Sequence, residues 1–294
     1  MSDVSINVNA DVDVEHLKLE STRTRLKKYI FTLIAIMIGA MFLFPLYMLA
    51  ITSIKPNTEV LLPTFWPHNP TLDPWIDQFT NRDFLSWLSN SFVIATLAMS
   101  ISFVLGVAAG YGMARYNIPG KNGLLLTFLV TQMMPASVLL MPMFLVFSRL
   151  GWLNTLHAPA VAITTGSIPF IVVVLRPYFM TIPKSLDDAA RIDGCNAFTS
   201  FIYIMLPIIR TGIITILVIT FLHGWNDLIY SMTFNVDISM RPLTANISRF
   251  MDQYGTRPNY IMAYGMILVL PVLFAFIFLQ KYIIGGLTQG AVKE

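Results

Sequence analysis

One charged segment has residue types and spacing that predict two short helices joined by a turn. Residues 186–207 read LDDAARIDGCNAFTSFIYIMLP and carry four charged side chains, the one Cys of the chain and a central Gly. Ser185 follows Pro183 and, with Asp188 three residues later, predicts a capped helix start. Gly194 predicts the helix end, because Gly tolerates the left-handed conformation common there. These residue types suit non-covalent contact through charge and shape, not catalysis.

The rest of this segment predicts a second short helix. NAFTSFIYIML places apolar residues at helical spacing, and Pro207 is expected to close that helix. Ala189 and Ala190 leave one side of the first helix thin, so that a partner could approach closely. An ordinary amphipathic loop resting on the membrane surface would share these features, so helicity alone does not decide between the two interpretations.

Polar side chains also interrupt apolar stretches. His223, Asn226 and Asp227 in FLHGWNDLIY are costly in lipid and should face protein or water. Asp227 lies 19 residues beyond Ile208, or about 28 Å along a helix, which predicts a position near the outer interface. An interfacial helix end and a role in a translocation path both fit this position. Trp225 could stack on a sugar or anchor the chain at the interface.

A third apolar stretch, TQMMPASVLLMP, contains Gln132 and two prolines that break backbone hydrogen bonds. TTGSIPF, farther along, adds Gly166 and Pro169. Helices broken in this way often line a substrate path. The candidate residues of a translocation path are Gln132, Pro135, Trp225, Asn226 and Asp227.

The chain lacks recognisable catalytic equipment. It has no G-x-x-x-x-G-K-[ST] loop, so we do not expect it to hydrolyse ATP, and it has no G-x-S-x-G or H-E-x-x-H motif. Its four His residues have no metal-ligand spacing, and the single Cys195 excludes a disulfide framework or a Cys-based metal cluster. RTRLKK is its longest basic run, which argues against nucleic-acid binding. We predict no catalytic residue, no cofactor and no metal in this chain.

Composition indicates an all-α integral membrane protein. Of 294 residues, 55% are hydrophobic and 12% are charged, and the mean hydropathy is +0.67. A helix needs about 20 apolar residues to cross the hydrocarbon core. Six runs are long enough, at about 29–51, 88–113, 123–147, 158–180, 208–232 and 260–284.

The distribution of Lys and Arg predicts the orientation. RTRLKK precedes the first span and should stay in the cytoplasm, so six spans place both termini there. Thirteen of the 19 Lys and Arg then fall on the inner side. Residues 186–207 lie on that side, between spans four and five. Residues 1–28 become a cytoplasmic tail, whose polar, acidic first 20 residues we expect to be mobile, and residues 285–294 form a second tail.

The charged segment resembles the signature loop of ATP-binding-cassette (ABC) importer permeases. That loop usually begins Glu-Ala-Ala, and here it begins at Asp188, a side chain shorter by one methylene. Four other stretches are similar to sugar-importer permeases of the maltose type: TSIKP (52–56), NSFVIA (90–95), WNDL (225–228) and GLTQGAVKE (286–294). The matching positions of the loop are Asp188, Ala189, Ala190, Gly194, Ile204, Leu206 and Pro207.

The resemblance implies a type I ABC importer permease fold over residues 29–284. Within it, the loop 183–207 would be a coupling helix docked in a cytoplasmic ATPase subunit. The tail residues Thr288, Gln289 and Gly290 would contact the ATPase dimer. The implied partners are a second homologous permease subunit, two ATPase subunits that bind Mg-ATP, an external solute-binding protein and membrane lipid.

The function implied is import of a sugar, or of a related polyol or glycoside, across the bacterial inner membrane by alternating access. An importer for another solute, such as an amino acid or a metal, is the nearest alternative. A membrane-embedded enzyme is a further one, against which the missing catalytic motifs count, and a structural or sensory membrane protein is another.

Overall fold

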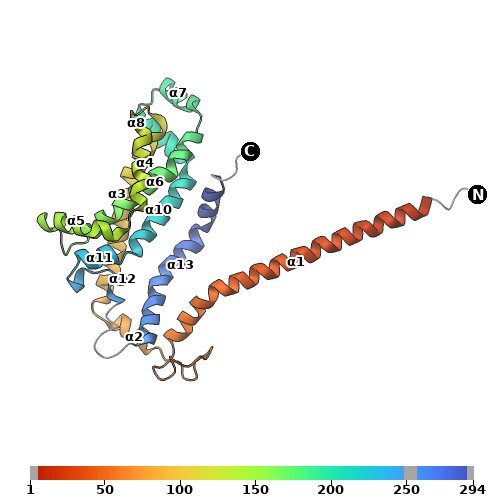
Figure 1. Ribbon diagram of the computed structural model, residues 1–294, viewed down its shortest axis with the longest axis horizontal. Coiled ribbons are helices and arrows are strands. Elements are labelled where there is room, and N and C mark those ends of the chain that lie inside the picture. The colour runs from red at the N-terminus through yellow and green to blue at the C-terminus, as the bar shows by residue number, and fades with distance from the viewer. Residues whose placement is uncertain (1–5, 248–256, 290–294) are drawn as a thin grey trace, which may run out of the picture.

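The computed structural model describes residues 6–247 and 257–289, and every regular element within those ranges is helical. The helices form a bundle with α7 and α8 at one end and α2 and α12 at the other (Figure 1). The elements are α1 (Ile6–Ser53), α2 (Asp73–Thr80), α3 (Phe84–Arg115), α4 (Lys121–Met133), α5 (Ala136–Arg149), α6 (His157–Thr181), α7 (Lys184–Ile192), α8 (Ala197–Ser200), the π-helix η1 (Phe201–Met205), α9 (Leu206–Ile208), α10 (Arg210–Trp225), α11 (Ile229–Phe234), the 3₁₀-helix η2 (Ile238–Met240), α12 (Leu243–Asn246) and α13 (Pro258–Gln289).

Four described helical segments are long and apolar enough to cross a membrane. They are Lys27–Ser53, Phe84–Arg115, His157–Thr181 and Pro258–Ile277. Two further pairs of helices pass the same test together but are bent, and counting each pair as one span gives six. The first pair is α4 with α5, at 99°, and the second is Ala197–Ile208 with α10, at 85°.

The predicted third span is broken at Pro135. Met134 and Pro135 are both extended, and α5 begins at Ala136. An extended residue before Pro is expected, because the Pro ring disfavours helical geometry at that position. Pro142, by contrast, lies inside α5.

The predicted fifth span, 208–232, is wrong in its bounds. The helix α10 ends at Trp225, residues 226–228 are not helical, and α11 begins at Ile229. At the other end, Pro207 lies within α9 and does not close the preceding helix, which breaks instead at Ile209 (φ −96°, ψ 18°). Asp227 therefore occupies a break between helices and not a position within one.

The first helix is longer than predicted. We expected a mobile tail over residues 1–20, but α1 begins at Ile6. Residues 6–28 contain neither Gly nor Pro, so no residue there stops the helix. The C-terminal part of α1 packs against α13, and the rest of α1 extends away from the bundle toward the N-terminus (Figure 1). Tyr29 and Met41 on α1 are more than 70% exposed.

The centre of the bundle is built on α3, which packs against α6 and α10. Small residues let these helices approach closely. A Cβ placed on Gly106 would lie 2.8 Å from the Ile171 side chain, and one on Gly224 would lie 2.6 Å from the Ala95 backbone. These contacts fix α6 and α10 on two sides of α3.

Candidate translocation cavity and coupling helix

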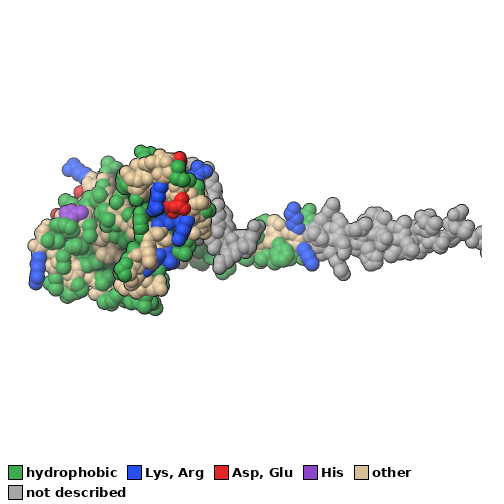
Figure 2. Space-filling view, turned by 90° about the horizontal axis from the view of Figure 1, so that it is seen from above, with side chains coloured by type: hydrophobic (Ala, Val, Ile, Leu, Met, Phe, Trp, Pro, Cys, Tyr) green, Lys and Arg blue, Asp and Glu red, His purple; other side chains and the backbone are tan. Residues whose placement is uncertain are grey.

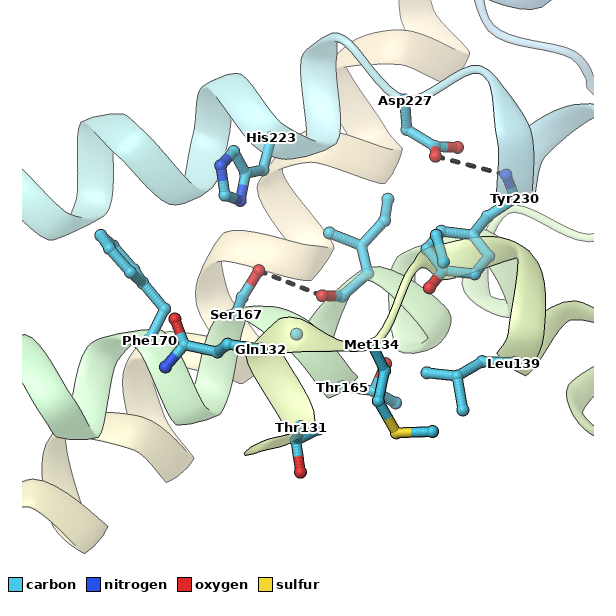
Figure 3. Close-up of a pocket in the computed structure, with 13 residues that line it drawn as sticks. Thr131, Gln132, Met134, Leu139, Thr165, Ser167, Phe170, His223, Asp227 and Tyr230 are labelled. Carbon is cyan, nitrogen blue, oxygen red and sulfur yellow. Dashed lines mark hydrogen bonds between the residues drawn. The ribbon is translucent and has the colours of Figure 1, made fainter. Parts of the chain in front are cut away.

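Two breaks between helices, one between α4 and α5 and one between α10 and α11, meet at one cavity of about 320 Å³. The break between α4 and α5 supplies one wall, α6 a second, and α10 with α11 a third (Figure 3). Non-helical backbone at membrane depth is tolerated where it is buried in protein or lines a cavity. The lining residues are Thr131, Gln132, Met134, Ala136, Leu139, Ile163, Thr165, Gly166, Ser167, Phe170, His223, Asp227 and Tyr230.

Asp227 is held in place by the start of α11. One carboxylate oxygen accepts a hydrogen bond from the Tyr230 backbone N–H at 3.3 Å. The other accepts bonds from the Ser231 N–H at 2.8 Å and the Ser231 hydroxyl at 2.7 Å. Thr244 also donates to the Asp227 backbone carbonyl, which ties this break to α12. The carboxylate is thus a fixed, half-buried negative group at the cavity wall.

The hydroxyl groups of the wall are turned back onto their own helices. Thr131 donates to the Thr127 carbonyl at 2.8 Å, and Ser167 donates to the Ile163 carbonyl at 3.0 Å (Figure 3). Thr165 donates to the Ala162 carbonyl at 2.7 Å. These bonds use the hydroxyl protons. Thr131 and Thr165 are partly exposed and keep oxygen lone pairs that can accept from a solute, whereas Ser167 is 1% exposed.

Two polar side chains reach the cavity from opposite walls. Gln132 lies at the end of α4 and His223 near the end of α10, and both are exposed in the isolated subunit. The His223 ring lies 6.2 Å from the Phe170 ring, measured between centroids, at an angle of 43°. Figure 3 shows Gln132 and Phe170 close to each other beneath His223. The three walls of the cavity together offer an amide, an imidazole and an aromatic face.

The helix α7 lies at one end of the bundle and contacts the end of α3. Arg115 Nε is 3.4 Å from the Asp187 carboxylate, and these side chains are 7% and 21% exposed. Viewed onto that end, Lys and Arg side chains gather beside Asp and Glu (Figure 2). The predicted capping by Ser185 and Asp188 is wrong, because Pro183 occupies the N-cap and no side chain caps α7.

Gly194 ends α7 as predicted, with a φ of 81°. The segment after it departs from the prediction of one second helix, since α8 covers only Ala197–Ser200 and a π-helix follows. Asn196 caps α8, accepting a hydrogen bond from the Thr199 N–H at 2.9 Å. This segment then bends into α10 at Ile209.

One family profile decides the identity of the chain. Its description is binding-protein-dependent transport system inner membrane component, and it matches residues 102–289. The chain belongs to this family of membrane transport components. The matched range includes α7 and all thirteen residues of the cavity wall. The transport component is accordingly a multi-pass protein of the inner membrane.

Its relatives include named permease proteins of transport systems. The arabinooligosaccharides transport system permease protein AraQ of Halalkalibacterium halodurans is 31% identical over 85% of this chain and 91% of the relative. The trehalose/maltose transport system permease protein MalG of Thermococcus litoralis is 27% identical over 91% and 98%. A solved bacterial ABC transporter involved in the import of alginate, an acidic polysaccharide, has a TM-score of 0.76 at 18% identity over 88% and 96%. That last likeness indicates the fold.

The structure separates the residues that the sequence proposed for a translocation path. Gln132 and Asp227 line the cavity, and Pro135 lies between the lining residues Met134 and Ala136. Trp225 points elsewhere: it is 1% exposed and its indole N–H donates to the Leu268 carbonyl at 3.1 Å. Asn226 is exposed and is not among the lining residues.

Sequence analysis did not single out several residues of the wall. Ser167 and Phe170 belong to α6, and Tyr230 is the second residue of α11. The signal for the first two was the Gly166 and Pro169 pair, which marked this stretch as irregular. Tyr230 carried no local signal, because its place depends on the break after Trp225.

The residues of the signature loop fall into an outward and an inward set. Asp188, Ala189, Gly194 and Pro207 are exposed. Ala190 is 2% exposed, and Ile204 and Leu206 pack against the buried cluster of α3, α6 and α10. Sequence analysis missed Ile192, whose side chain is 87% exposed at the end of α7.

The predicted tail contacts fall at the edge of the described chain. Thr288 and Gln289 belong to the last turn of α13, so the helix passes the predicted end of the sixth span at residue 284. Gly290 lies outside the described residues.

Proposed function

We propose that this chain is the transmembrane subunit of an ATP-driven, binding-protein-dependent importer for a sugar or a related polyol or glycoside. The observation that carries the proposal is the polar cavity at which the α4–α5 break and the α10–α11 break meet, in a chain of this transport family. Such a site at the junction of discontinuous helices suits a solute on its way through the membrane. AraQ and MalG are named for the transport of arabinooligosaccharides and of trehalose and maltose, which favours a saccharide over an amino acid or a metal.

The proposed assembly contains more than this chain. Two ATPase subunits bind and hydrolyse Mg-ATP on the cytoplasmic side, and a solute-binding protein delivers the sugar from outside. A second permease subunit completes the pathway. If each bent pair crosses the membrane as one span, the six spans would put both termini in the cytoplasm, as the RTRLKK run before the first span favours.

Coupling to the ATPase is assigned to α7 and the loop 183–207. Ile192, Ala189 and Gly194 form its outward surface, and a thin surface next to one apolar side chain suits docking in a cleft. Asp188 offers a charge to a basic partner. The Arg115–Asp187 ion pair gives α7 a direct mechanical connection to α3.

The motion would then reach the cavity through two routes. Movement of α7 acts on α3 through the ion pair and on α10 through the bend at Ile209. Because α10 ends next to Asp227, a tilt of this helix changes one wall of the cavity against the other two. Alternating access follows from exchange between two arrangements of these walls, with ATP binding and hydrolysis selecting between them.

The C-terminal tail is the second proposed contact with the ATPase subunits. Thr288, Gln289 and Gly290 would meet the ATPase dimer below the permease. Deletion of residues 288–294 should lower solute-stimulated ATPase activity, or its coupling to uptake, in a complex that still assembles. Full coupled activity of the truncated complex would remove the tail from the proposal.

Reconstitution tests the proposed function. The complete complex in liposomes, with its binding protein outside and ATP inside, should accumulate a radiolabelled saccharide from a panel of mono- and oligosaccharides. This chain alone should give neither phosphate release nor uptake. Uptake of an amino acid or a metal by the complex, without uptake of any saccharide, would overturn the sugar assignment, and activity of the isolated chain would overturn the assembly.

A further inference from the structure

The charge of the cavity wall is one-sided. Among the thirteen described residues that line it, none is Lys or Arg, and Asp227 is its carboxylate. An anionic solute would meet no cation on this wall and would lie near a fixed negative charge. Because Asp227 is half-buried, that repulsion is stronger than it would be from a fully exposed carboxylate.

Asp227 does not require a cationic solute in return. Its two carboxylate oxygens already accept three hydrogen bonds, from the Tyr230 N–H, the Ser231 N–H and the Ser231 hydroxyl. These three bonds occupy most of the acceptor sites that the two oxygens offer. The group therefore repels anions while offering little free hydrogen-bonding capacity to an amine.

The remaining polar groups fit hydroxyl-rich solutes. Gln132 supplies an amide that can donate and accept, and His223 supplies ring nitrogens across from it. Thr165 is partly exposed and presents an oxygen lone pair, since its proton bonds to its own helix. Phe170 adds an apolar face beside His223. Dispersed neutral hydrogen-bonding groups with an aromatic wall suit an uncharged, many-hydroxyl ligand.

We propose that this cavity selects uncharged saccharides and rejects acidic ones, with Gln132 and His223 binding sugar hydroxyl groups and Asp227 excluding carboxylate-bearing sugars. The inference rests on the proposed sugar-import function and adds its charge specificity. This charge specificity would distinguish the permease from the ABC transporter of similar fold that is involved in the import of alginate, an acidic polysaccharide.

The test measures binding to the membrane complex without the solute-binding protein, because that protein could impose its own selection. Saturation-transfer NMR on the detergent-solubilised complex would compare maltotriose and arabinotriose with trigalacturonate. The neutral trisaccharides should bind and trigalacturonate should not. Gln132→Ala and His223→Ala should each weaken neutral binding by about three- to tenfold, the effect of losing one hydrogen bond.

Matched controls lie outside the cavity. Gln280→Ala removes an exposed amide on α13, and His157→Ala removes an imidazole that packs on Trp152, so both should leave binding unchanged. Asp227→Asn removes the charge at nearly constant shape and should allow trigalacturonate to bind. If that variant does not assemble, Gln132→Ala and the wild-type preference still decide.

The outcomes separate the two proposals. Equal binding of trigalacturonate and the neutral trisaccharides, or unchanged binding in both alanine variants, would overturn the charge-selection inference. Failure of the wild-type complex to bind any neutral trisaccharide would overturn it as well. Absence of ATP-driven saccharide uptake in liposomes, with the binding preference intact, would instead overturn the proposed import function.

Discussion

Arg115 Nε lies 3.4 Å from a carboxylate oxygen of Asp187, which joins the last turn of α3 to the first turn of α7. The side chains are 7% and 21% exposed, so water screens the pair less than a surface pair. It is a direct polar link between the proposed ATPase dock and the helix on which the bundle is built.

Breaking this pair should loosen coupling. Asp187→Asn leaves Arg115 largely buried without its counter-charge, at a cost below the roughly 3–5 kcal/mol measured for fully buried pairs, because Asp187 is partly exposed. We expect solute-stimulated ATPase activity to persist while uptake per ATP falls. Parallel assays of phosphate release and uptake in liposomes measure the ratio.

The charge-reversed double variant, Arg115→Asp with Asp187→Arg, is the control for that experiment. It restores an ion pair at the same place and should recover part of the coupling that either single variant loses. Equal uptake per ATP in the wild type and Asp187→Asn would mean that the pair has no part in transmission.

Substitution of Gly194 should act through two separable effects, backbone strain and side-chain bulk. Its φ of 81° lies in the left-handed region, so Ala there costs about 1–2 kcal/mol in this chain alone. A Cβ would meet nothing within 4 Å, so bulk causes no clash within the subunit. Gly194→Trp should therefore block assembly with the ATPase or uncouple transport, while membrane insertion remains intact.

Two smaller substitutions separate backbone strain from bulk. Gly194→Asn accepts the left-handed conformation and should be nearly neutral, and Gly194→Ala should lower stability without blocking the dock. Pull-down of the ATPase subunits and solute-stimulated ATPase activity are the measurements. Normal uptake and normal stimulation in Gly194→Trp would show that no partner surface covers this turn.

Three of the spans could be predicted from the sequence because their signals are local. The long apolar runs predicted at 29–51, 88–113 and 158–180 correspond to the candidate spans Lys27–Ser53, Phe84–Arg115 and His157–Thr181 within four residues at each end. Pro135 marked the break of the third span, and Gly194 marked the end of α7 through its conformational freedom. In each case one residue type or one uninterrupted run carries the physical cause.

The cavity and the α3–α7 link had no such local signal. Asp227 reads as a polar residue within an apolar run, and only its three hydrogen bonds from Tyr230 and Ser231 reveal a new helix start. Arg115 and Asp187 are brought together by packing of separate helices. Trp225 read as a path residue because aromatic rings occur in sugar sites, yet the fold buries it against α13.

Lys55 should hold the segment between α1 and α2 in place. Its side chain is 1% exposed, and its amine donates to the Leu62 carbonyl at 3.0 Å and the Thr64 carbonyl at 2.8 Å. Lys55→Met keeps most of the packing volume but leaves both carbonyls without this donor, at a cost of about 1–3 kcal/mol. Hydrogen exchange of residues 56–72 should rise, with little change in α3.

A nearby exposed residue gives the control for Lys55. Arg82 lies on the same side of the bundle and is exposed, so Arg82→Met should leave that exchange unchanged. Equal protection of residues 56–72 in the wild type and in Lys55→Met would show that the buried amine does not hold this segment.

Gly224 should be indispensable for the contact between α3 and α10. A Cβ at this position would lie 2.6 Å from Ala95 Cα and 3.3 Å from Ala95 Cβ, and a backbone atom cannot move aside as a flexible side chain can. Gly224→Ala must therefore push the two helices apart, at a cost of about 1–3 kcal/mol. The shift would also move His223 and Asp227, so neutral-sugar uptake should fall together with the melting temperature of the complex.

Gly112→Ala is the matched control for Gly224→Ala, because a Cβ on that helical Gly meets nothing within 4 Å. This variant should be neutral or raise stability by up to about 1 kcal/mol. Unchanged melting and uptake in Gly224→Ala would mean that α10 can shift away from α3 without disturbing the cavity wall, which would also weaken the proposed route from α10 to Asp227.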